Sequence, residues 1–162
     1  ENLGVITPEV ENLRVRHRSP GMHVLQFAVC DPGYTLDDVA ENSVCYTGTH
    51  DNDTTIGWFH GSPDDIRSDA EIEEAQNAAL EMTGGQAETV HTDLIKAAFS
   101  TKARLAIAPL QDFLGLGSEA RINVPGTSGG NWRWRVIDAQ ITPDICDNIA
   151  SMVSTSRRVP TR

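Results

Sequence analysis

Apolar residues gather in three short runs that lie far apart along the chain. The runs cover residues 23–29, 44–49 and 104–109, and proline, glycine and aspartate residues bound the first of them. Short apolar runs between turn residues are typical of strands that are buried on both faces. The pattern therefore predicts three buried strands.

Helix signals separate these runs. Thr7 and Thr142 each precede a proline and an acidic residue, a pattern that starts a helix. Ser68 and Glu71 form a capping-box pair inside a helical stretch that ends at Gly84-Gly85. Four helices are predicted, over residues 7–18, 62–83 and 87–100 and from residue 142 onward.

Strands that alternate with helices predict an α/β fold built from parallel βαβ units. Three strands are too few to close a barrel. In parallel α/β folds the polar chemistry lies at the carboxyl ends of the strands, so the residues just after each run are the candidates for a site. These are Cys30-Asp31, residues 50–53 and Gln111-Asp112.

Composition and charge narrow the class of ligand. The 162 residues are 39% apolar and 22% charged, which is typical of a globular protein. Acidic residues outnumber lysine and arginine by 23 to 13, and the net charge is −10. Because binding to phosphates depends on lysine and arginine, nucleic acid is disfavoured as a partner, and neutral or cationic ligands are favoured.

The cysteines and the longest apolar runs bear on location. Cys30, Cys45 and Cys146 are widely spaced and odd in number, so neither a disulfide framework nor a zinc ribbon is indicated. No apolar run approaches the roughly 20 residues of a membrane-spanning helix. We therefore expect a soluble, cytoplasmic protein with no membrane partner.

The segment 47–55 is the densest polar cluster, and it follows the second predicted strand. Its asparagine and aspartate residues suit a turn, with Asp53 or Thr54 capping a short helix. The alternative is that His50 and Asp51 present an imidazole and a carboxylate side by side to a ligand. A calcium loop is disfavoured because the residues after Thr54 break the required pattern.

Three other patterns favour ordinary structure over chemistry. Residues 115–120 match the G-x-G-x-x-A dinucleotide fingerprint, but Pro125-Gly126 ends any helix too early to hold a pyrophosphate. The remaining histidines have no metal-ligand spacing, so no metal site is predicted. Trp58, Trp132 and Trp134 lie in or beside polar loops, where such rings stack on sugars or pack in the core.

Several longer motifs occur together and in a fixed order. They are ENLGVITPEV at residues 1–10, PGMHVLQF at 20–27, YTGTHDNDT at 46–54, PLQD at 109–112, LGLGSEAR at 114–121, NVPG at 123–126 and NW at 131–132. The series resembles the C-terminal half of the catalytic barrel of 4-alpha-glucanotransferase, also called amylomaltase or disproportionating enzyme, of glycoside hydrolase family 77. The resemblance runs to about residue 136, and residues 137–162 carry no comparable motif.

The resemblance implies a TIM (β/α)₈ barrel, of which this chain supplies about strands six to eight with their flanking helices. Enzymes of the family transfer alpha-1,4-glucan segments to the 4-hydroxyl of glucose or of another glucan by a retaining double displacement. Maltooligosaccharides and glucans derived from starch or glycogen are the implied donors, with glucose as an acceptor. No cofactor is implied.

The resemblance also implies roles for single residues. Glu1 is expected to be the acid/base, and Asp51 is expected to stabilise the transition state, with His50 binding the same glucose. Two groups are expected to line the bound glucan: Asn123 and Pro125 on the acceptor side, and Phe27 and Asp31 near the donor and acceptor sugars.

The motif that carries the nucleophile in this family does not occur in the chain, because it would precede Glu1. A barrel of this type takes about 250 residues. Residues 1–162 are therefore expected to be one partial domain that needs the N-terminal half of the barrel. The alternatives are a maltooligosaccharide-binding half-barrel without catalysis and a purely structural half-domain.

Overall fold

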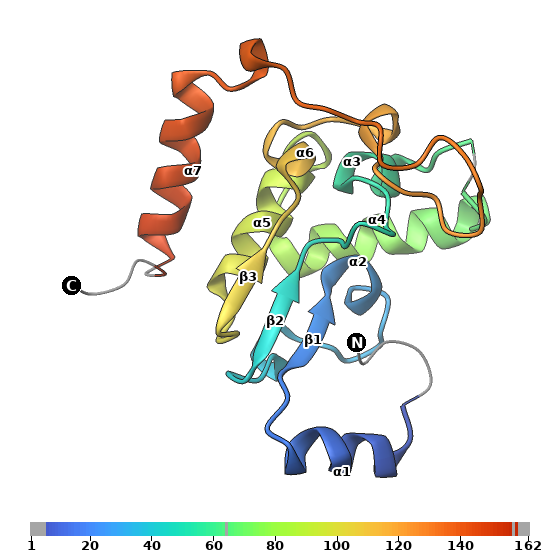
Figure 1. Ribbon diagram of the computed structural model, residues 1–162, viewed down its shortest axis with the longest axis vertical. Helices are drawn as coiled ribbons and strands as arrows, with labels where there is room; N and C mark the ends of the chain where they lie inside the picture. The colour runs from blue at the N-terminus through green and yellow to red at the C-terminus, as the bar shows by residue number, and fades with distance from the viewer. Residues whose placement is uncertain (1–5, 64, 157, 159–162) are drawn as a thin grey trace.

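Three parallel strands form a sheet in the order β1-β2-β3 in the computed structural model, which describes residues 6–63, 65–156 and 158 (Figure 1). They are β1 (Gly21–Val24), β2 (Ser43–Tyr46) and β3 (Leu105–Ile107), and each overlaps one of the three predicted runs. Val44 of β2 is in register with Met22 of β1 and Leu105 of β3. The predicted parallel α/β arrangement is confirmed.

The first predicted strand is wrong in its second half. β1 ends at Val24, and the next residues form the short helix α2 (Leu25–Ala28). Leu25 and Val29 are both buried whereas Phe27 between them is exposed, which is a helical spacing of apolar residues. A short apolar run does not by itself distinguish a strand from a helical turn. Here the helix forms because it buries Leu25 and Val29 on one face.

Helices connect and flank the strands. They are α1 (Pro8–Arg16), α3 (Thr55–His60), α4 (Asp69–Thr83), α5 (Val90–Ser100), α6 (Leu110–Phe113) and α7 (Pro143–Thr155), with 3-10 turns at Leu36–Asp38, Ala87–Thr89, Ser118–Ala120 and Asp138–Gln140. The helices predicted at residues 7–18, at 87–100 and after Thr142 are confirmed, with the first turn of 87–100 being 3-10. Within the described residues, no helix is long and apolar enough to span a membrane.

The helix predicted from Ser62 begins later than expected. Ser68 is its N-cap: the backbone N–H of Glu71 donates to Ser68 Oγ at 3.3 Å, and the Glu71 carboxylate accepts from the Ser68 N–H at 2.7 Å. This capping box satisfies amide groups that the first helical turn leaves without partners. The capping pair inside the stretch therefore marked the start of α4 more accurately than Ser62.

The core lies between the sheet and the helices on one side of it. α5 contributes six residues to this core, and α4 adds Ala75 and Ala79. Ser43 and Cys45 of β2 point to this side and are buried. α7 packs beside α5 through Met152 and Val153. The core list is Leu25, Val29, Val39, Cys45, Trp58, Phe59, Ala75, Ala79, Val90, Leu94, Ile95, Ala97, Ala98, Phe99 and Ala103.

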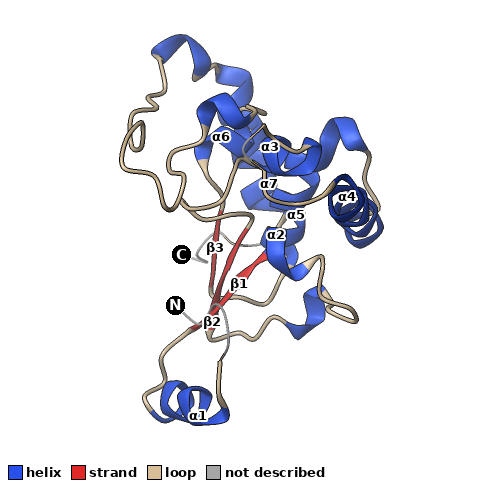
Figure 2. Ribbon diagram, turned by 90° about the vertical axis from the view of Figure 1, so that its right-hand side faces the viewer, coloured by secondary structure: helices blue, strands red, loops and turns tan. Residues whose placement is uncertain are grey.

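The opposite face of the sheet lies open. Figure 2 shows the sheet almost edge-on, with α4 and α5 on one side of it. On the other side, Leu105 and Ile107 of β3 are 55% and 43% exposed, and Val44 and Tyr46 of β2 are half-buried. Residues alternate between the faces of a strand, so the helix-covered face and the open face each receive every second residue. The open face carries the cavity described next.

Candidate active site

An open cavity of about 460 Å³ lies along the uncovered face of the sheet, from Pro20 and Gly21 at the start of β1 to the loops after β2 and β3. Apolar side chains of all three strands contribute to its wall, and loop residues after β2 and β3 supply polar groups. Its lining comprises Pro20, Gly21, Met22, Val44, Tyr46, Gly48, Thr49, His50, Asn52, Asp53, Thr54, Ile107, Pro109, Gln111, Arg121 and Ile122. A concave site with an apolar wall and a few converging polar groups suits a small organic ligand.

The loop after β2, residues 47–54, forms the turn expected from its composition. The side-chain carbonyl of Asn52 accepts hydrogen bonds from the Thr49 N–H at 2.9 Å and from the Thr49 hydroxyl at 2.8 Å. Thr54 caps α3, because its hydroxyl accepts from the Gly57 N–H at 3.1 Å. Turn and site are not exclusive here, since the turn is what carries His50 and Asp51.

His50, Asp51 and Asn123 come together at this loop. His50 Nε2 lies 3.3 Å from Asp51 Oδ1, and Asn123 donates its side-chain N–H to the same oxygen at 2.6 Å. About half of the His50 and Asp51 side chains is exposed, at 50% and 49%. A carboxylate, an imidazole and an amide are thereby presented together to the solvent, which is a set able to bind the hydroxyl groups of a ligand.

Arg121, which directly follows the 3-10 turn Ser118–Ala120, contacts both segments of this group. Its guanidinium donates to the Asp51 carbonyl at 2.9 Å and to the Asn123 carbonyl at 2.9 Å. It also lies 4.0 Å from the carboxylate of Asp53. One side chain therefore contacts the backbone on both sides of the Asp51–Asn123 hydrogen bond. The sequence pattern gave Arg121 no role, because nothing in its spacing relates it to residues 51 and 53.

An exposed indole lies next to His50. The ring centroids of Trp132 and His50 are 5.3 Å apart, and Trp132 is 56% exposed. The backbone φ angle of Trp132, 62°, lies in the left-handed region, which is unusual for a residue other than glycine. The backbone N–H of Trp132 donates to the Ile122 carbonyl at 2.7 Å. Trp58, by contrast, is a buried core residue. Trp132 is therefore an exposed ring beside His50, whereas Trp134 is half-buried.

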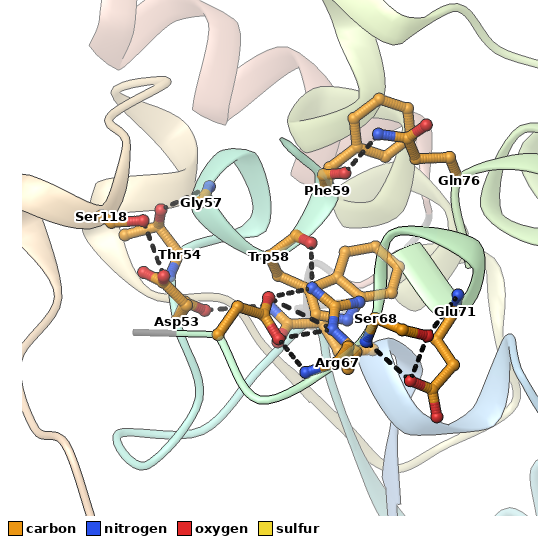
Figure 3. Close-up of polar contacts among 12 residues, drawn as sticks. Asp53, Thr54, Gly57, Trp58, Phe59, Arg67, Ser68, Glu71, Gln76 and Ser118 are labelled. Atoms are coloured by element: carbon orange, nitrogen blue, oxygen red, sulfur yellow. Dashed lines mark hydrogen bonds and ion pairs between the residues drawn. The ribbon is translucent and has the colours of Figure 1, made fainter. Parts of the chain in front are cut away.

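The end of the loop is fixed to its surroundings through Asp53 and α3 (Figure 3). The Ser118 hydroxyl donates to the Asp53 carboxylate at 2.6 Å, which joins the loop to the 3-10 turn after α6. At the other end of α3, Gln76 of α4 donates its side-chain amide to the Phe59 carbonyl at 2.7 Å. Arg67 donates to the Trp58 carbonyl at 2.5 Å. Both ends of α3 are therefore held by side chains from elsewhere in the fold.

Within the described residues, no hydrogen bond joins the remaining predicted site residues to this group. Phe27 and Pro125 are exposed and do not line the cavity at His50, and Asp51 and Asn123 do not line it either, although His50 does. Asp31 lines a separate cavity of about 680 Å³ between the loop after α2 and helix α4. Glu1 lies outside the described residues. Their roles stay predictions.

Sequence reasoning placed Asp112 at a strand end without giving it a role. Asp112 is 1% exposed and accepts hydrogen bonds from Thr47 and Thr55, at the two ends of the loop. Burial raises the pKa of its carboxyl, and these hydrogen bonds oppose that effect. Among the residues that the structure describes, no three His, Cys, Asp or Glu side chains group as metal ligands.

Residues 1–140 match glycoside hydrolase family 77, described as 4-alpha-glucanotransferase. The chain belongs to this family. The resemblance noted from the motifs is therefore confirmed, and the match ends close to the point where those motifs end.

The relatives are longer proteins of which this chain matches a part. The 4-alpha-glucanotransferase of Synechocystis sp. is 48% identical over 140 residues, which are 83% of this chain and 26% of the relative. The chloroplastic/amyloplastic 4-alpha-glucanotransferase of Solanum tuberosum is 43% identical over 139 residues, which are 84% of this chain and 23% of the relative. The chain thus spans about a quarter of the length of these two proteins.

A solved structure supports the same grouping. Amylomaltase from Streptococcus agalactiae, in complex with acarbose, aligns with a TM-score of 0.84 and 27% sequence identity. The alignment covers 99% of this chain and 32% of the amylomaltase chain. The three-stranded α/β fold described above is therefore the fold of a segment of an amylomaltase.

Proposed function

We propose that this chain is part of a 4-alpha-glucanotransferase, which moves alpha-1,4-glucan segments from a donor to the 4-hydroxyl of glucose or of another glucan. The observation that carries the proposal is the contact of His50, Asp51 and Asn123 at the carboxyl ends of the parallel strands. These residues come from two segments 72 positions apart, and the family membership of the chain supplies the reaction class.

Asp51 acts on the transition state in this proposal. The sugar carbon that is transferred develops positive charge, and a carboxylate held nearby stabilises that charge more than it stabilises the neutral substrate. The hydrogen bond from Asn123 fixes the Asp51 carboxylate and leaves its second oxygen for the ligand. His50 donates to, or accepts from, a hydroxyl of the same sugar ring.

Glu1 is the proposed acid/base, and the nucleophile comes from residues that precede it. A retaining glycosidase needs its two reacting carboxyl groups about 5 Å apart, with one of them kept protonated near neutral pH. In a closed barrel the carboxyl ends of neighbouring strands meet around one site. We therefore propose that residues outside this chain complete an eight-stranded barrel and bring the reacting carboxyl groups together with Asp51.

The open surfaces of the described residues support this completion. The edges of β1 and β3 pair with no further strand in the described part of the chain. The uncovered face of the sheet exposes Leu105 and Ile107, and α1 exposes Val10 and Leu13 on one side. Unpaired edges and contiguous apolar surface are features that proteins ordinarily cover.

Neutral glucans fit the chemistry of the cavity. We propose maltooligosaccharides and glucans derived from starch or glycogen as donors and glucose as an acceptor, without cofactor. The amylomaltase from Streptococcus agalactiae, whose structure is similar to this chain, was solved in complex with acarbose. The cytoplasmic location stays a prediction, since one relative is named as chloroplastic or amyloplastic.

A chimera tests the proposal. This chain would replace the matching segment of the Synechocystis 4-alpha-glucanotransferase, and the product would be incubated with maltotriose. We expect glucose and longer glucans to appear. Folding of the chimera is checked by circular dichroism and gel filtration. A folded chimera that binds maltooligosaccharide but forms no glucans longer than maltotriose would contradict the proposal.

The exposed ring of Trp132 beside His50 favours one second candidate, a maltooligosaccharide-binding module without catalysis. Sugar faces stack on such rings whether or not a bond is broken. The chimera separates the two candidates, because a binding module leaves maltotriose unchanged. An active chimera would exclude the second candidate.

A further inference from the structure

Asp112 is a buried carboxylate that does not face the ligand cavity. It lies in α6, directly after β3, and is 1% exposed. One of its oxygens accepts a hydrogen bond from the Thr47 hydroxyl at 2.7 Å, and the other accepts from the Thr55 N–H at 2.7 Å. Both partners are themselves fully buried.

These two partners are the first residue of the loop that carries His50 and Asp51 and the residue just after its end. Thr47 follows β2, and Thr55 begins α3. A single carboxylate therefore joins the two ends of the loop across its base and sets the distance between them. In addition, each carboxylate oxygen has its own partner. Movement of the start of the loop breaks the hydrogen bond to Thr47, and movement of its end breaks the hydrogen bond to Thr55.

Gln26 is another residue that contacts both ends of the loop, through its backbone N–H at Thr47 and its side-chain amide at Asp53. The further contacts of the loop hold single residues within it. Ser118 holds Asp53 through its carboxylate. Arg121 and Asn123 hold Asp51. No side chain other than Asp112 in the described residues bridges Thr47 to Thr55.

A buried carboxylate is a costly way to fill space. Removing an ionised group from water is unfavourable, and a neutral side chain of similar size often gives an equally stable core. Charged acceptors form shorter and stronger hydrogen bonds than neutral ones, so Asp112 fixes the two ends more tightly than an amide at this position. The buried carboxylate thus fixes the positions of Thr47 and Thr55, although its desolvation lowers the stability of the core.

We propose that Asp112 is a positioning residue for Asp51: it holds the base of the loop so that the Asp51 carboxylate lies where the transition state needs it. The inference rests on the proposed function. A catalytic group that is displaced by about 1 Å loses up to roughly 100-fold in rate, so a distant clamp has a measurable effect.

Thr47→Val is the main test, because valine keeps the shape of threonine and removes the hydroxyl. In the folded chimera we expect kcat to fall about tenfold or more while KM changes less than about threefold, because positioning acts on the transition state more than on binding. The matched control is Thr101→Val. Thr101 is also a buried threonine whose hydroxyl donates to a nearby acceptor, the Ala98 carbonyl at 2.8 Å, but it precedes β3 and lies at the far end of the sheet. We expect the control to retain wild-type kcat.

Hydrogen exchange gives a second readout that needs no catalysis. In Thr47→Val the backbone amides of residues 49–54 should exchange faster relative to the rest of the chain, whereas Thr101→Val should leave them unchanged. Asp112→Asn serves as a second variant, since the amide retains one acceptor for the Thr55 N–H; we expect a smaller change in the same direction.

The outcomes separate the two proposals. An inactive wild-type chimera would contradict the proposed function, and the exchange measurement would still decide the role of Asp112. A folded Thr47→Val variant with wild-type kcat and wild-type exchange at residues 49–54 would overturn the inference. The same holds if Thr101→Val lowers kcat as much as Thr47→Val does, because the effect would then be a general loss of stability.

Discussion

The site depends on a small number of side-chain contacts between residues that are distant in the sequence. Asn123 and Arg121 reach the Asp51 loop from a segment about 70 positions further along the chain. The resemblance to family 77 pointed to His50, Asp51 and Asn123 in advance. Ser118 and Arg121 lie in one of the motifs that carry the resemblance, at residues 114–121, but neither was given a role, because hydrogen bonds from a loop follow no periodicity that a sequence pattern reveals.

Asp51→Asn tests the role of the carboxylate. In the chimera we expect glucan transfer to fall by at least about 100-fold, since removal of one preorganised electrostatic group typically costs 10²–10³ in kcat. The fold should be unaffected because Asp51 is half exposed and the amide still accepts from Asn123. Initial rates of glucose release from maltotriose give the result. A rate within a few-fold of the wild type would show that another group stabilises the transition state.

Trp132 allows a test that separates stability from sugar binding. Both Trp132→Ala and Trp132→Gly remove the ring beside His50 and should weaken maltooligosaccharide binding, measured by calorimetry. The glycine variant should be the more stable of the two by about 1 kcal/mol, because a positive φ angle strains alanine but not glycine. Equal affinity for wild type and both variants would remove Trp132 from the site. Equal stability of the two variants would argue against the left-handed backbone.

At the scale of the elements, capping and periodicity predicted type more reliably than extent. The Ser68–Glu71 pair marked the start of α4, while the helix signal at Ser62 was wrong by a full turn or more. The run at residues 23–29 was divided between a strand and a helix, because the local pattern fits both and packing against the core decides. The G-x-G-x-x-A match proved to be a loop and a 3-10 turn, as predicted.

Gly57 in α3 offers a prediction about how this short helix meets the rest of the fold. A methyl group at Gly57 would collide with the Ser118 hydroxyl and with the Asp53 carboxylate, and these two groups are hydrogen-bonded to each other. We expect Gly57→Ala to destabilise the chain by about 1–3 kcal/mol through overpacking. Urea unfolding provides the measurement. Gly84→Ala, at the C-cap of α4, is the control for backbone effects, because that position has open space around it and strains alanine only through its positive φ.

On the scale of the whole molecule, the two faces of the sheet differ in how far they are covered. Helices α4 and α5 cover one face of the sheet (Figure 2). On the other face, the apolar side chains of Leu105 and Ile107 are exposed. The three strands predicted from the sequence were already too few to close a barrel. Which face would be open was not predictable, because residues of both faces are largely apolar and only packing against α5 assigns Ser43 and Cys45 to the core.

The open face predicts association of the isolated chain. At micromolar concentrations we expect the 17.6 kDa chain to elute from gel filtration as a larger species, since unpaired strand edges and apolar patches promote contacts between copies. Replacing Leu105 and Ile107 by threonine should reduce the association at little cost to the fold, because both side chains are largely exposed in the isolated chain.

In the chimera the same two substitutions should lower the melting temperature, because the completed barrel buries that face. Light scattering and thermal unfolding provide the two readouts. A well-folded monomer of the isolated wild-type chain would contradict the need for further barrel strands, and a chimera indifferent to the substitutions would show that the face stays open in the complete protein.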